Sequence, residues 1–409
     1  MYALPPGSVP AIVRIVELHF DVLVVGGGIA GCAAALAASA AGRRVGLVRA
    51  APGATALSAG GWTGPLPDRL GAALARAGLP FAPAPAPLPH PAGRLDAHDL
   101  AAPSQRAAAP IEDALVCGIV GLAGFPARAL ARAWGARGAG PAGAATLEAG
   151  PVPRGGWSPA SLAAYLEREP ARLAEALADA VRRASAARAV LPAVLGVERV
   201  DDVRAALEAA AGVPVGEALG APPSLPGWRL ERALATALDE AGVTVLPGRV
   251  VDRAMEARRV SAVWVRPAPA SGAAAEAVAG PPPVESVQIA ARSFVLATGK
   301  YLAGGIRADD RLLEPALGCP VWIEYLGAMF DEADPLALTH PDHAAEQPLL
   351  RAGVRTDDAG RPVDRRGDVV YENVRVAGSV RAGVDAAAPG LGHAAADGWR
   401  AGELAAEDA

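Results

Sequence analysis

The chain has few cysteines, and they are widely spaced. Cys32, Cys117 and Cys319 are the only three in 409 residues, and none forms a C-x-x-C pair. Three such cysteines give no disulfide framework. They also exclude an iron–sulfur cubane held by this chain alone, since that cluster needs four thiolates. We therefore expect a reducing, cytoplasmic environment.

Basic runs, aromatic residues and long apolar stretches are also scarce. The net charge is −5 with no long basic run, which argues against a nucleic-acid surface. The composition is 52% hydrophobic but only 4% aromatic, because much of the apolar content is alanine. No run of 18 uncharged apolar residues is present, so no segment is expected to span a bilayer. Residues 1–20 carry charges within their apolar part, and no small-residue cleavage site follows, so no secretory signal is expected.

The most informative stretch is residues 20–49, FDVLVVGGGIAGCAAALAASAAGRRVGLVR. Its apolar, β-branched start is typical of a strand buried on both faces. A G-x-G-x-x-G pattern follows at Gly26, Gly28 and Gly31. The alanine-rich run 29–41 then predicts a helix, because alanine has the highest helix propensity. Glycines placed between a strand and a helix predict a dinucleotide-binding βαβ unit.

The glycines have separate physical roles in such a unit. Gly26 permits the tight turn, and Gly28 lets a pyrophosphate approach the backbone. Gly31 lets helix and strand pack closely. The helix N-terminus presents N–H groups and a partial positive charge to the phosphate. The predicted cofactor contacts here are Gly26, Gly27, Gly28, Ile29, Ala30 and Gly31.

One part of the fingerprint is missing. A dinucleotide site usually has an acidic residue about 20 positions further on, which accepts hydrogen bonds from the ribose. The second predicted strand ends instead at Arg49. Arginine has donors and no acceptor, so it cannot replace that carboxylate, although it can pair with a phosphate or face solvent. This weakens a prediction of NAD and leaves open how the nucleotide end of a flavin is held.

The middle of the chain is less regular. The small residues of 50–64 include Ser58, Gly60 and Gly61, which either lie against a cofactor or belong to a surface loop. Residues 65–110 are rich in Pro and Ala and predict a loop or linker, in which His90 and His98 are interpreted as solvated histidines. Apolar spacing then predicts amphipathic helices in 159–187 and 200–211.

The chain returns to strand and glycine signals after Pro226. A helix is expected over 228–241, followed by strands and a Pro/Ala/Gly-rich hairpin tip at 267–283. The strand 294–299 ends in A-T-G, and 373–383 reads NVRVAGSVRAG, a strand entering a glycine turn. A helix is expected to end the chain.

These signals predict an α/β fold: a Rossmann-like FAD/NAD(P)-binding domain, with a parallel sheet plus a β-hairpin or meander, and an inserted α+β cap domain. The expected division assigns 18–64, 222–305 and 366–409 to the flavin-binding domain. Residues 65–221 and 306–365 are assigned to a cap that binds substrate or a partner.

The order of three segments resembles a known family. FDVLVVGGGIAG, a helix–strand–hairpin piece ending VLATG, and NVRVAGSVRAG together resemble the two-dinucleotide-fold flavoproteins, which include the fumarate reductase and succinate dehydrogenase flavoproteins. Within that group, LVRAAPGATALSAGG and SFVLATGKYLAGGI resemble B subunits of anaerobic glycerol-3-phosphate dehydrogenases, which also lack the acidic ribose residue.

This resemblance implies oxidation of glycerol 3-phosphate to dihydroxyacetone phosphate. Electrons would pass through a companion flavoprotein A subunit and an iron–sulfur C subunit to membrane quinone. It implies FAD or FMN as cofactor and a cytoplasmic protein that contacts the inner face of the cell membrane only through a partner subunit. The usual G-D of such flavoproteins is Gly378-Ser379 here, where a hydroxyl replaces a carboxylate. The further cofactor contacts predicted are Arg49, Ser58, Gly60, Gly61, Val250, Ala297, Thr298, Gly299, Gly378, Ser379 and Gly392.

A phosphorylated polyol needs a cation for its phosphate and a base for its hydroxyl proton. The candidate cations are Arg307, Arg351 and Arg381, and the candidate bases are His340 and His343, with solvated side chains as the alternative. No metal site is predicted, because His340-x-x-His343 has no third ligand. Two other functions stay open: a self-sufficient FAD-dependent oxidoreductase of another small substrate, and a flavoprotein-like structural partner.

Overall fold

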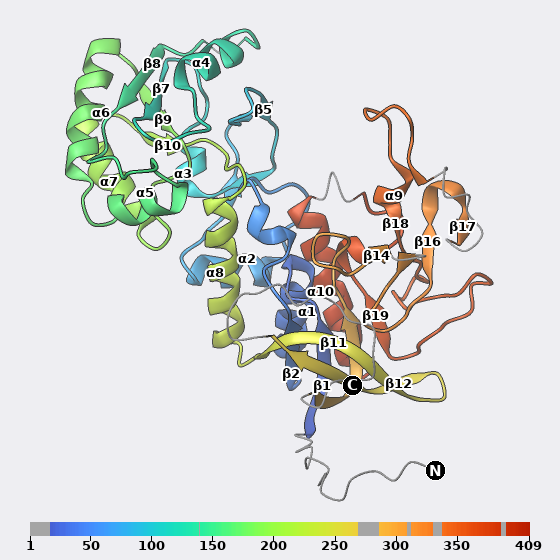
Figure 1. Cartoon of the computed structure of the whole chain (residues 1–409). Helices are drawn as coiled ribbons and strands as arrows, with labels where there is room; N and C mark the ends of the chain where they lie inside the picture. The colour runs from blue at the N-terminus through green and yellow to red at the C-terminus, as the bar shows by residue number, and fades with distance from the viewer. Residues whose placement is uncertain (1–16, 139, 269–285, 309–311, 330–337, 386–389) are drawn as a thin grey trace, which may run out of the picture.

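The computed structural model of this chain describes residues 17–409 except 139, 269–285, 309–311, 330–337 and 386–389. It contains a six-stranded sheet near one end and a second, four-stranded sheet near the other (Figure 1). The long helix α8 (Leu225–Glu240) runs between the two regions.

Five strands of the larger sheet form a parallel set. The order is β11-β2-β1-β13-β19, with every one of these pairings parallel. A strand order of this kind places β1 at the centre, where it is buried on both faces. The bounds are β1 Glu17–Val25, β2 Val45–Arg49, β11 Thr244–Glu256, β13 Val287–Leu296 and β19 Val374–Val376.

The same sheet continues as an antiparallel meander. The second half of β11 pairs with β12 (Arg259–Pro267), and β12 pairs with the first half of β13. Asn373, which is buried, fixes this junction, because its side chain bonds both the N–H and the C=O of Val260 and the carbonyl of Arg292. The expected hairpin tip at 267–283 lies almost wholly outside the described residues.

Helices cover one face of the parallel set. Helix α1 (Ile29–Ala40) packs against α10 (Leu391–Glu407) over much of its length, and α8 and α2 (Asp68–Arg76) contribute to the same core. A Cβ at Gly398 or Gly402 would overlap the carbonyls of Ala30 or Ala34, so α1 and α10 are in backbone contact. The alanine-rich composition of α1 therefore serves close helix packing as well as helix propensity.

The opposite face of the sheet is covered by a different part of the chain. Strand β16 (Val321–Ile323) pairs antiparallel with β17 (Ala328–Met329) and with β18 (Ala352–Val354), and its apolar side chains share a core with β12, β13 and β19. Residues 65–221 and 306–365, which the expected division groups together, thus contribute to different cores. The remaining short elements on this side are β14 Arg307–Ala308, β15 Leu312–Leu313, η2 Glu324–Leu326 and α9 Pro348–Arg351.

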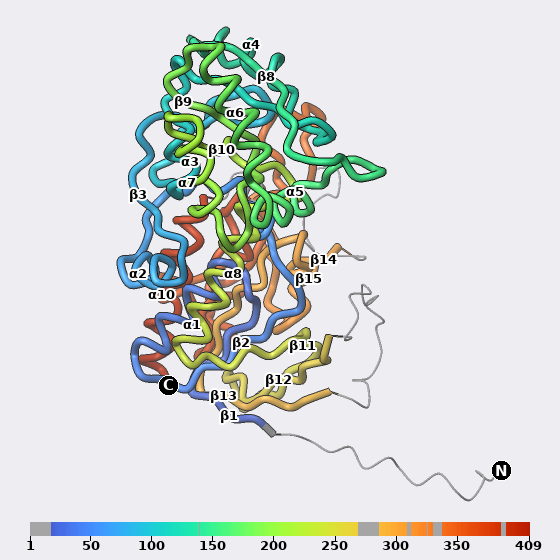
Figure 2. Tube along the Cα trace, turned by 90° about the vertical axis from the view of Figure 1, so that its left-hand side faces the viewer, coloured from blue at the N-terminus to red at the C-terminus, as the bar shows by residue number. Residues whose placement is uncertain are grey.

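The unit inserted between β2 and α8 has its own sheet, ordered β10-β9-β7-β8, with all pairings parallel. In Figure 2 its strands β8, β9 and β10 lie at the opposite end of the molecule from β1 and β13. The overall α/β class is confirmed, but this unit alternates strands and helices and is α/β rather than the expected α+β. Its elements are β7 Ala114–Ile119, α4 Ala127–Gly135, β8 Gly143–Leu147, α5 Pro159–Leu166, α6 Ala171–Ala184, β9 Arg188–Leu191, α7 Val200–Ala211 and β10 Val215–Glu217.

A buried ion pair joins α8 to the inserted unit. Arg229 donates to both carboxylate oxygens of Glu217, at 2.6 and 2.9 Å, and to the carbonyl of Gly196. The Glu217 carboxylate is fully buried.

The segment expected to be a linker, 65–110, contains α2 and the short elements β3 Ala82–Pro83, β4 Leu88–Pro89, β5 Leu95–Asp96, β6 Leu100–Ala101 and α3 Pro103–Arg106.

Candidate functional site

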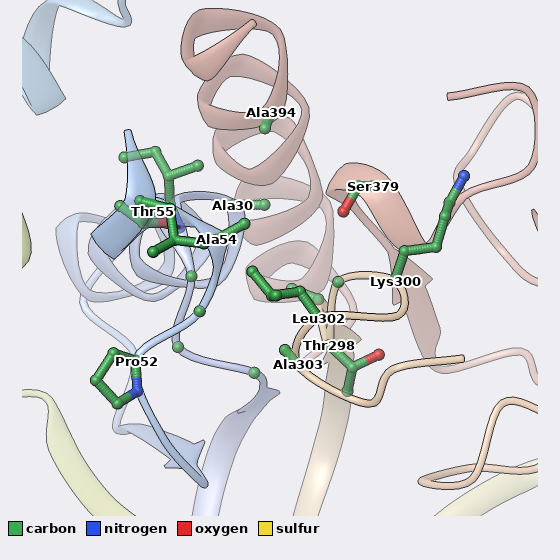
Figure 3. A pocket seen from close by; sticks show the side chains of 18 of the residues that line it. Ala30, Pro52, Ala54, Thr55, Thr298, Lys300, Leu302, Ala303, Ser379 and Ala394 are labelled. Carbon is green, nitrogen blue, oxygen red and sulfur yellow. Dashed lines mark hydrogen bonds between the residues drawn. The ribbon is translucent and has the colours of Figure 1, made fainter. Parts of the chain in front are cut away.

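A cavity of about 770 Å³ lies where the parallel strands end. The turns after β1, β2, β13 and β19 all reach it, so it occupies the crevice at the carboxyl edge of the sheet, where ligands bind in open α/β folds (Figure 3). Many predicted contacts line it: Gly26, Gly27, Gly28, Ile29, Ala30, Ser58, Gly61, Val250, Ala297, Thr298, Gly299 and Ser379.

The glycine turn between β1 and α1 opens toward this cavity. Gly26 adopts φ +113°, a conformation that favours glycine. A Cβ on Gly28 would meet only the Oγ1 of Thr55, at 3.6 Å, so its Cα borders open space. Gly31 lies outside the lining, and a Cβ there would overlap the Gly26 carbonyl. Within this stretch Gly28 therefore borders open space in the cavity, whereas Gly31 faces the protein interior.

Thr55 completes the N-terminus of α1. It belongs to the 3₁₀ helix Ala54–Leu57, which follows β2, and its Oγ1 accepts a hydrogen bond of 2.9 Å from the Ile29 N–H. The first turn of α1 contains no acidic residue. Thr55 also lines the cavity, so this helix N-terminus and a hydroxyl meet at one place suited to an anion.

Arg49 does not extend into the cavity. Its guanidinium forms an ion pair with Glu231 of α8, and its stem lies against Gly27, where a Cβ would be 2.7 Å from the Arg49 Cδ. Burial raises the pKa of Glu231, which Arg49 opposes. The other carboxylate oxygen, Glu231 Oε1, is buried and has no partner among the described residues. No signal in the sequence indicates that α8 supplies a carboxylate beside the end of β2, because the two residues are far apart in the chain.

The turns after β13 and β19 form the opposite wall. Thr298 and Gly299 follow β13, and the Ser379 hydroxyl lies 3.8 Å from where a Gly299 Cβ would be. Gly378 lies behind the lining and donates its N–H to Asp397 of α10 at 2.7 Å. Asp397 therefore places a carboxylate against the backbone of the Gly378-Ser379 turn, one residue before the position of the missing aspartate.

Lys300 follows Thr298 and Gly299 in this wall. It is 4% exposed, and its Nζ donates to the carbonyl of Leu350 at 2.7 Å and to that of Val384. Burial lowers its pKa to about 8. Lys300 thus ties the cavity wall to two other chain segments.

The loop from Ser58 to Thr63 forms the remaining end of the cavity. Ser58 and Gly61 line it, whereas Gly60 turns away and lies against Gln105, whose Nε2 donates to the Ala59 carbonyl at 3.0 Å. Gly392 also lies behind the lining, because its N–H is bonded to the Thr63 carbonyl at 2.9 Å. Its neighbours Gly390 and Leu391 line the cavity at the start of α10.

The predicted catalytic residues lie elsewhere. His340 and His343 are exposed, and Arg351 pairs with Glu346; none of the three lines this cavity. Arg381 bonds Asp397 and the Oγ1 of Thr356, so it supports the turn after β19. Arg307 is also absent from the lining.

Three lining residues come from the segment that was expected to be a linker. Arg94, Asp96 and His98 reach the cavity beside Gly61 and Thr63. Low-complexity composition concealed them, and the only sequence signal was a charged and aromatic cluster, RLDAH, within a Pro- and Ala-rich stretch. Among the described residues, no cluster of three or more His, Cys, Asp or Glu side chains is placed to bind a metal ion, and no helix has the length and hydrophobicity that a bilayer crossing needs.

Known proteins resemble this chain over part of its length. The chain is 37% identical over 242 residues to a protein of Halobacterium salinarum named as the B subunit of a probable anaerobic glycerol-3-phosphate dehydrogenase, covering 58% of this chain and 51% of that one. It is 32% identical over 220 residues to the protein of Yersinia pestis named as the B subunit of the anaerobic enzyme, covering 53% and 46%. The chain therefore spans about half the length of the curated relatives it matches.

Solved structures give distant likenesses only. A 3-ketosteroid-Δ4-(5α)-dehydrogenase from Rhodococcus jostii is 14% identical, with a TM-score of 0.39 over 98% of this chain and 100% of that one. A flavocytochrome c3 fumarate reductase is 15% identical, with a TM-score of 0.38 over 96% and 78%. The sequence model of a family described as "FAD binding domain" matches residues 21–75 and 155–394, well over half of the chain. The chain belongs to this family of FAD-binding domains, and its cofactor is FAD.

Proposed function

We propose that this protein is a flavin-bearing B subunit of a quinone-linked glycerol-3-phosphate dehydrogenase, which oxidises glycerol 3-phosphate to dihydroxyacetone phosphate. At the coarser level it is an FAD-dependent oxidoreductase chain. The observation that carries the proposal is the cavity at the carboxyl edge of the sheet, in a chain that is similar over more than half its length to proteins named as B subunits.

The residues of the cavity fit FAD. The open Cα of Gly28 and the N-terminus of α1 suit a pyrophosphate, which FAD has and FMN lacks. Thr298 lines the cavity, and its buried Oγ1 has no hydrogen-bond partner among the described residues. Leu302 is 64% exposed beside the cavity, an apolar surface that a planar ring would cover (Figure 3). FAD supplies the two-electron chemistry when bound.

The chain's own groups position this cofactor. Gly28 and Thr55 would hold the diphosphate, and the Ser379 hydroxyl would suit a ribityl hydroxyl. The Gly390–Leu391 start of α10 directs a helix N-terminus toward the ring end, where it favours negative charge on the ring carbonyl. These contacts give the predicted cofactor residues their separate roles.

The electron route requires partners. In this proposal a companion flavoprotein A subunit and an iron–sulfur C subunit carry electrons toward membrane quinone, and the protein is cytoplasmic and peripheral on the inner face of the cell membrane through one of them. The names of the relatives support a multi-subunit enzyme, because each is named as a B subunit.

The proposal is tested with the purified full chain. Flavin released on denaturation and identified by mass should be FAD at near-equal stoichiometry. Glycerol 3-phosphate should then bleach the visible flavin absorption, either directly or after the companion subunits are added. A colourless protein that takes up no FAD would favour a structural partner. A flavin that another small alcohol reduces, while glycerol 3-phosphate has no effect under either condition, would favour a separate oxidoreductase.

A further inference from the structure

Several cationic side chains line the cavity, and they differ in the hydrogen bonds and contacts that they already make. Lys300 is bound to two backbone carbonyls. Arg249 comes from β11, and its guanidinium lies near Gly304. Arg94 lines the same cavity as Gly61 and Thr63, and its charge acts on His98, which contacts both.

The Arg94 guanidinium is fixed in orientation. Its Nε donates to both carboxylate oxygens of Asp96, at 2.7 and 2.9 Å. The backbone is also held, because the Arg94 carbonyl accepts from the His90 N–H and β5 pairs with β4. The two terminal nitrogens have no hydrogen bond to the described residues, and the side chain is 53% exposed. A planar group of N–H donors, anchored at one edge and open at the other, matches an oxyanion.

His98 and Thr63 line the same cavity as Arg94, and the charge of Arg94 acts on the His98 ring. The His98 ring lies against Gly61, and its Nδ1 is 3.0 Å from the Thr63 Oγ1. Its Nε2 is covered and has no partner among the described residues. Burial lowers the pKa of His98 and so favours the neutral imidazole, an effect that Asp96 and Asp99 oppose. In its neutral form the ring adds polar surface to the cavity without a second positive charge.

This corner also adjoins the cofactor end of the cavity. The Thr63 carbonyl accepts the N–H of Gly392, and Gly390 and Leu391 line the same space. A ligand held by Arg94 would therefore lie near the start of α10, where the proposed function puts the flavin ring. The predicted histidines at 340 and 343 have no such position.

We infer that Arg94, oriented by Asp96 and flanked by Thr63 and His98, is the subsite that holds the oxyanion of the substrate. This inference rests on the proposed function, which makes that oxyanion the phosphate of a small polyol phosphate. Arg94 contacts the phosphate, and Asp96 is a positioning residue that acts through Arg94. The neutral end of the substrate, with its hydroxyl, then extends toward the ring.

The test is binding to the FAD-loaded full chain, followed by the change in the flavin spectrum and by calorimetry. The probes are inorganic phosphate, sn-glycerol 3-phosphate and glycerol. Arg94→Met should weaken binding of both phosphates about ten- to hundred-fold, because charge-assisted hydrogen bonds are lost, and should leave FAD content and glycerol binding unchanged. Arg94→Lys should restore part of the affinity, since a point charge replaces the planar fork.

Two further variants separate positioning from folding. Asp96→Asn should weaken phosphate binding less than Arg94→Met does. In the Asp96→Asn background, Arg94→Lys should also change phosphate affinity less than it does in the unchanged protein. Arg106→Met is the matched control, because Arg106 also donates through Nε, to the Pro83 carbonyl, but lies outside the cavity lining. It should bind phosphate like the unchanged protein.

Phosphate affinity that is equal in Arg94→Met and the unchanged protein would overturn the inference, and so would the absence of phosphate binding to the unchanged FAD-loaded protein. The proposed function fails by a different result: phosphate binds through Arg94, but glycerol 3-phosphate does not reduce the flavin with or without companion subunits. The two failures are therefore distinguishable.

Discussion

Two glycines of one turn should respond to substitution in opposite ways. Gly28 has φ −76° and ψ −177°, an extended conformation that any residue adopts. Its Cβ would meet only Thr55, at ordinary contact distance. A Gly28→Val substitution therefore introduces no clash with the backbone, and its branched side chain enters the space beside the N-terminus of α1. Gly31→Ala instead puts a methyl group onto the Gly26 carbonyl.

The magnitudes follow from these contacts. If Gly28→Val excludes the diphosphate from two N–H donors, and each charge-assisted bond contributes about 1.5–3 kcal/mol, FAD affinity falls by about 3–6 kcal/mol, or roughly 10²- to 10⁴-fold. The free energy of unfolding of the cofactor-free protein should change by less than about 1 kcal/mol, because a glycine replaced at a compatible conformation costs little. Gly31→Ala should destabilise the cofactor-free protein by about 1–3 kcal/mol or more through overpacking.

The assay measures FAD affinity by fluorescence titration, and urea unfolding without FAD, for both variants. Unfolding must be followed without the cofactor, because bound FAD adds its own stabilisation by mass action. Stoichiometric FAD in purified Gly28→Val would refute the role of this turn as a phosphate cradle. Equal destabilisation by both substitutions would show that Gly28 also has a packing role.

Three other residues allow independent tests. Glu231→Gln should lower the free energy of unfolding of the cofactor-free protein by about 1–3 kcal/mol, because Arg49 loses a charge-assisted partner where both side chains are largely buried; an unchanged free energy in urea would mean that the pair contributes nothing to stability. Lys300, the only lysine, should give a single side-chain NMR signal that titrates near pH 8. Because this pKa lies below the unfolded value of 10.5, the free energy of unfolding should rise as the pH increases from about 8 to 10.5. A titration of the Lys300 signal above pH 10 would contradict its burial. Arg229→Met should lower the free energy of unfolding by about 3–5 kcal/mol in urea, because Glu217 stays buried without its partner, and a loss below 1 kcal/mol would mean that water reaches that carboxylate.

Local signals in the sequence were sufficient to predict the glycine turn between β1 and α1. Strand, glycine turn and helix lie in one contiguous stretch, and each residue's conformation follows from its neighbours. The helix expected over 29–41 is observed at Ile29–Ala40, and Gly42 ends it with φ +78°. The helix expected over 200–211 is observed at Val200–Ala211.

Local signals were not sufficient to predict contacts between residues that are far apart in the chain. Periodicity shows which face of a helix is buried, but not which strand it faces, so Glu231 and Asp397 could not be placed beside Arg49 and Gly378. The strands β9 and β10 have four and three residues, too few for any apolar period to stand out. Without them, the helices of the inserted unit had no visible parallel sheet to alternate with, and α+β was the natural expectation.

The point of insertion explains why a linker-like segment reaches the cavity. The chain leaves the larger sheet after β2, whose carboxyl end borders the cavity, and returns through Ser224 at the start of α8. The Ser224 hydroxyl donates to the Ser58 carbonyl, and the Gly220 N–H donates to the Ala59 carbonyl at 2.8 Å, so the outgoing and returning chains are joined beside the cavity. Any unit inserted at this point must lie next to the crevice. Its parts nearest to the joined outgoing and returning chains then face the ligand. Residues 94–98 occupy that place, whereas the inserted sheet lies farther out (Figure 1). Under the proposed function, the sheet that brings the segments together would hold the cofactor, and a short hairpin whose composition resembles a linker would select the substrate.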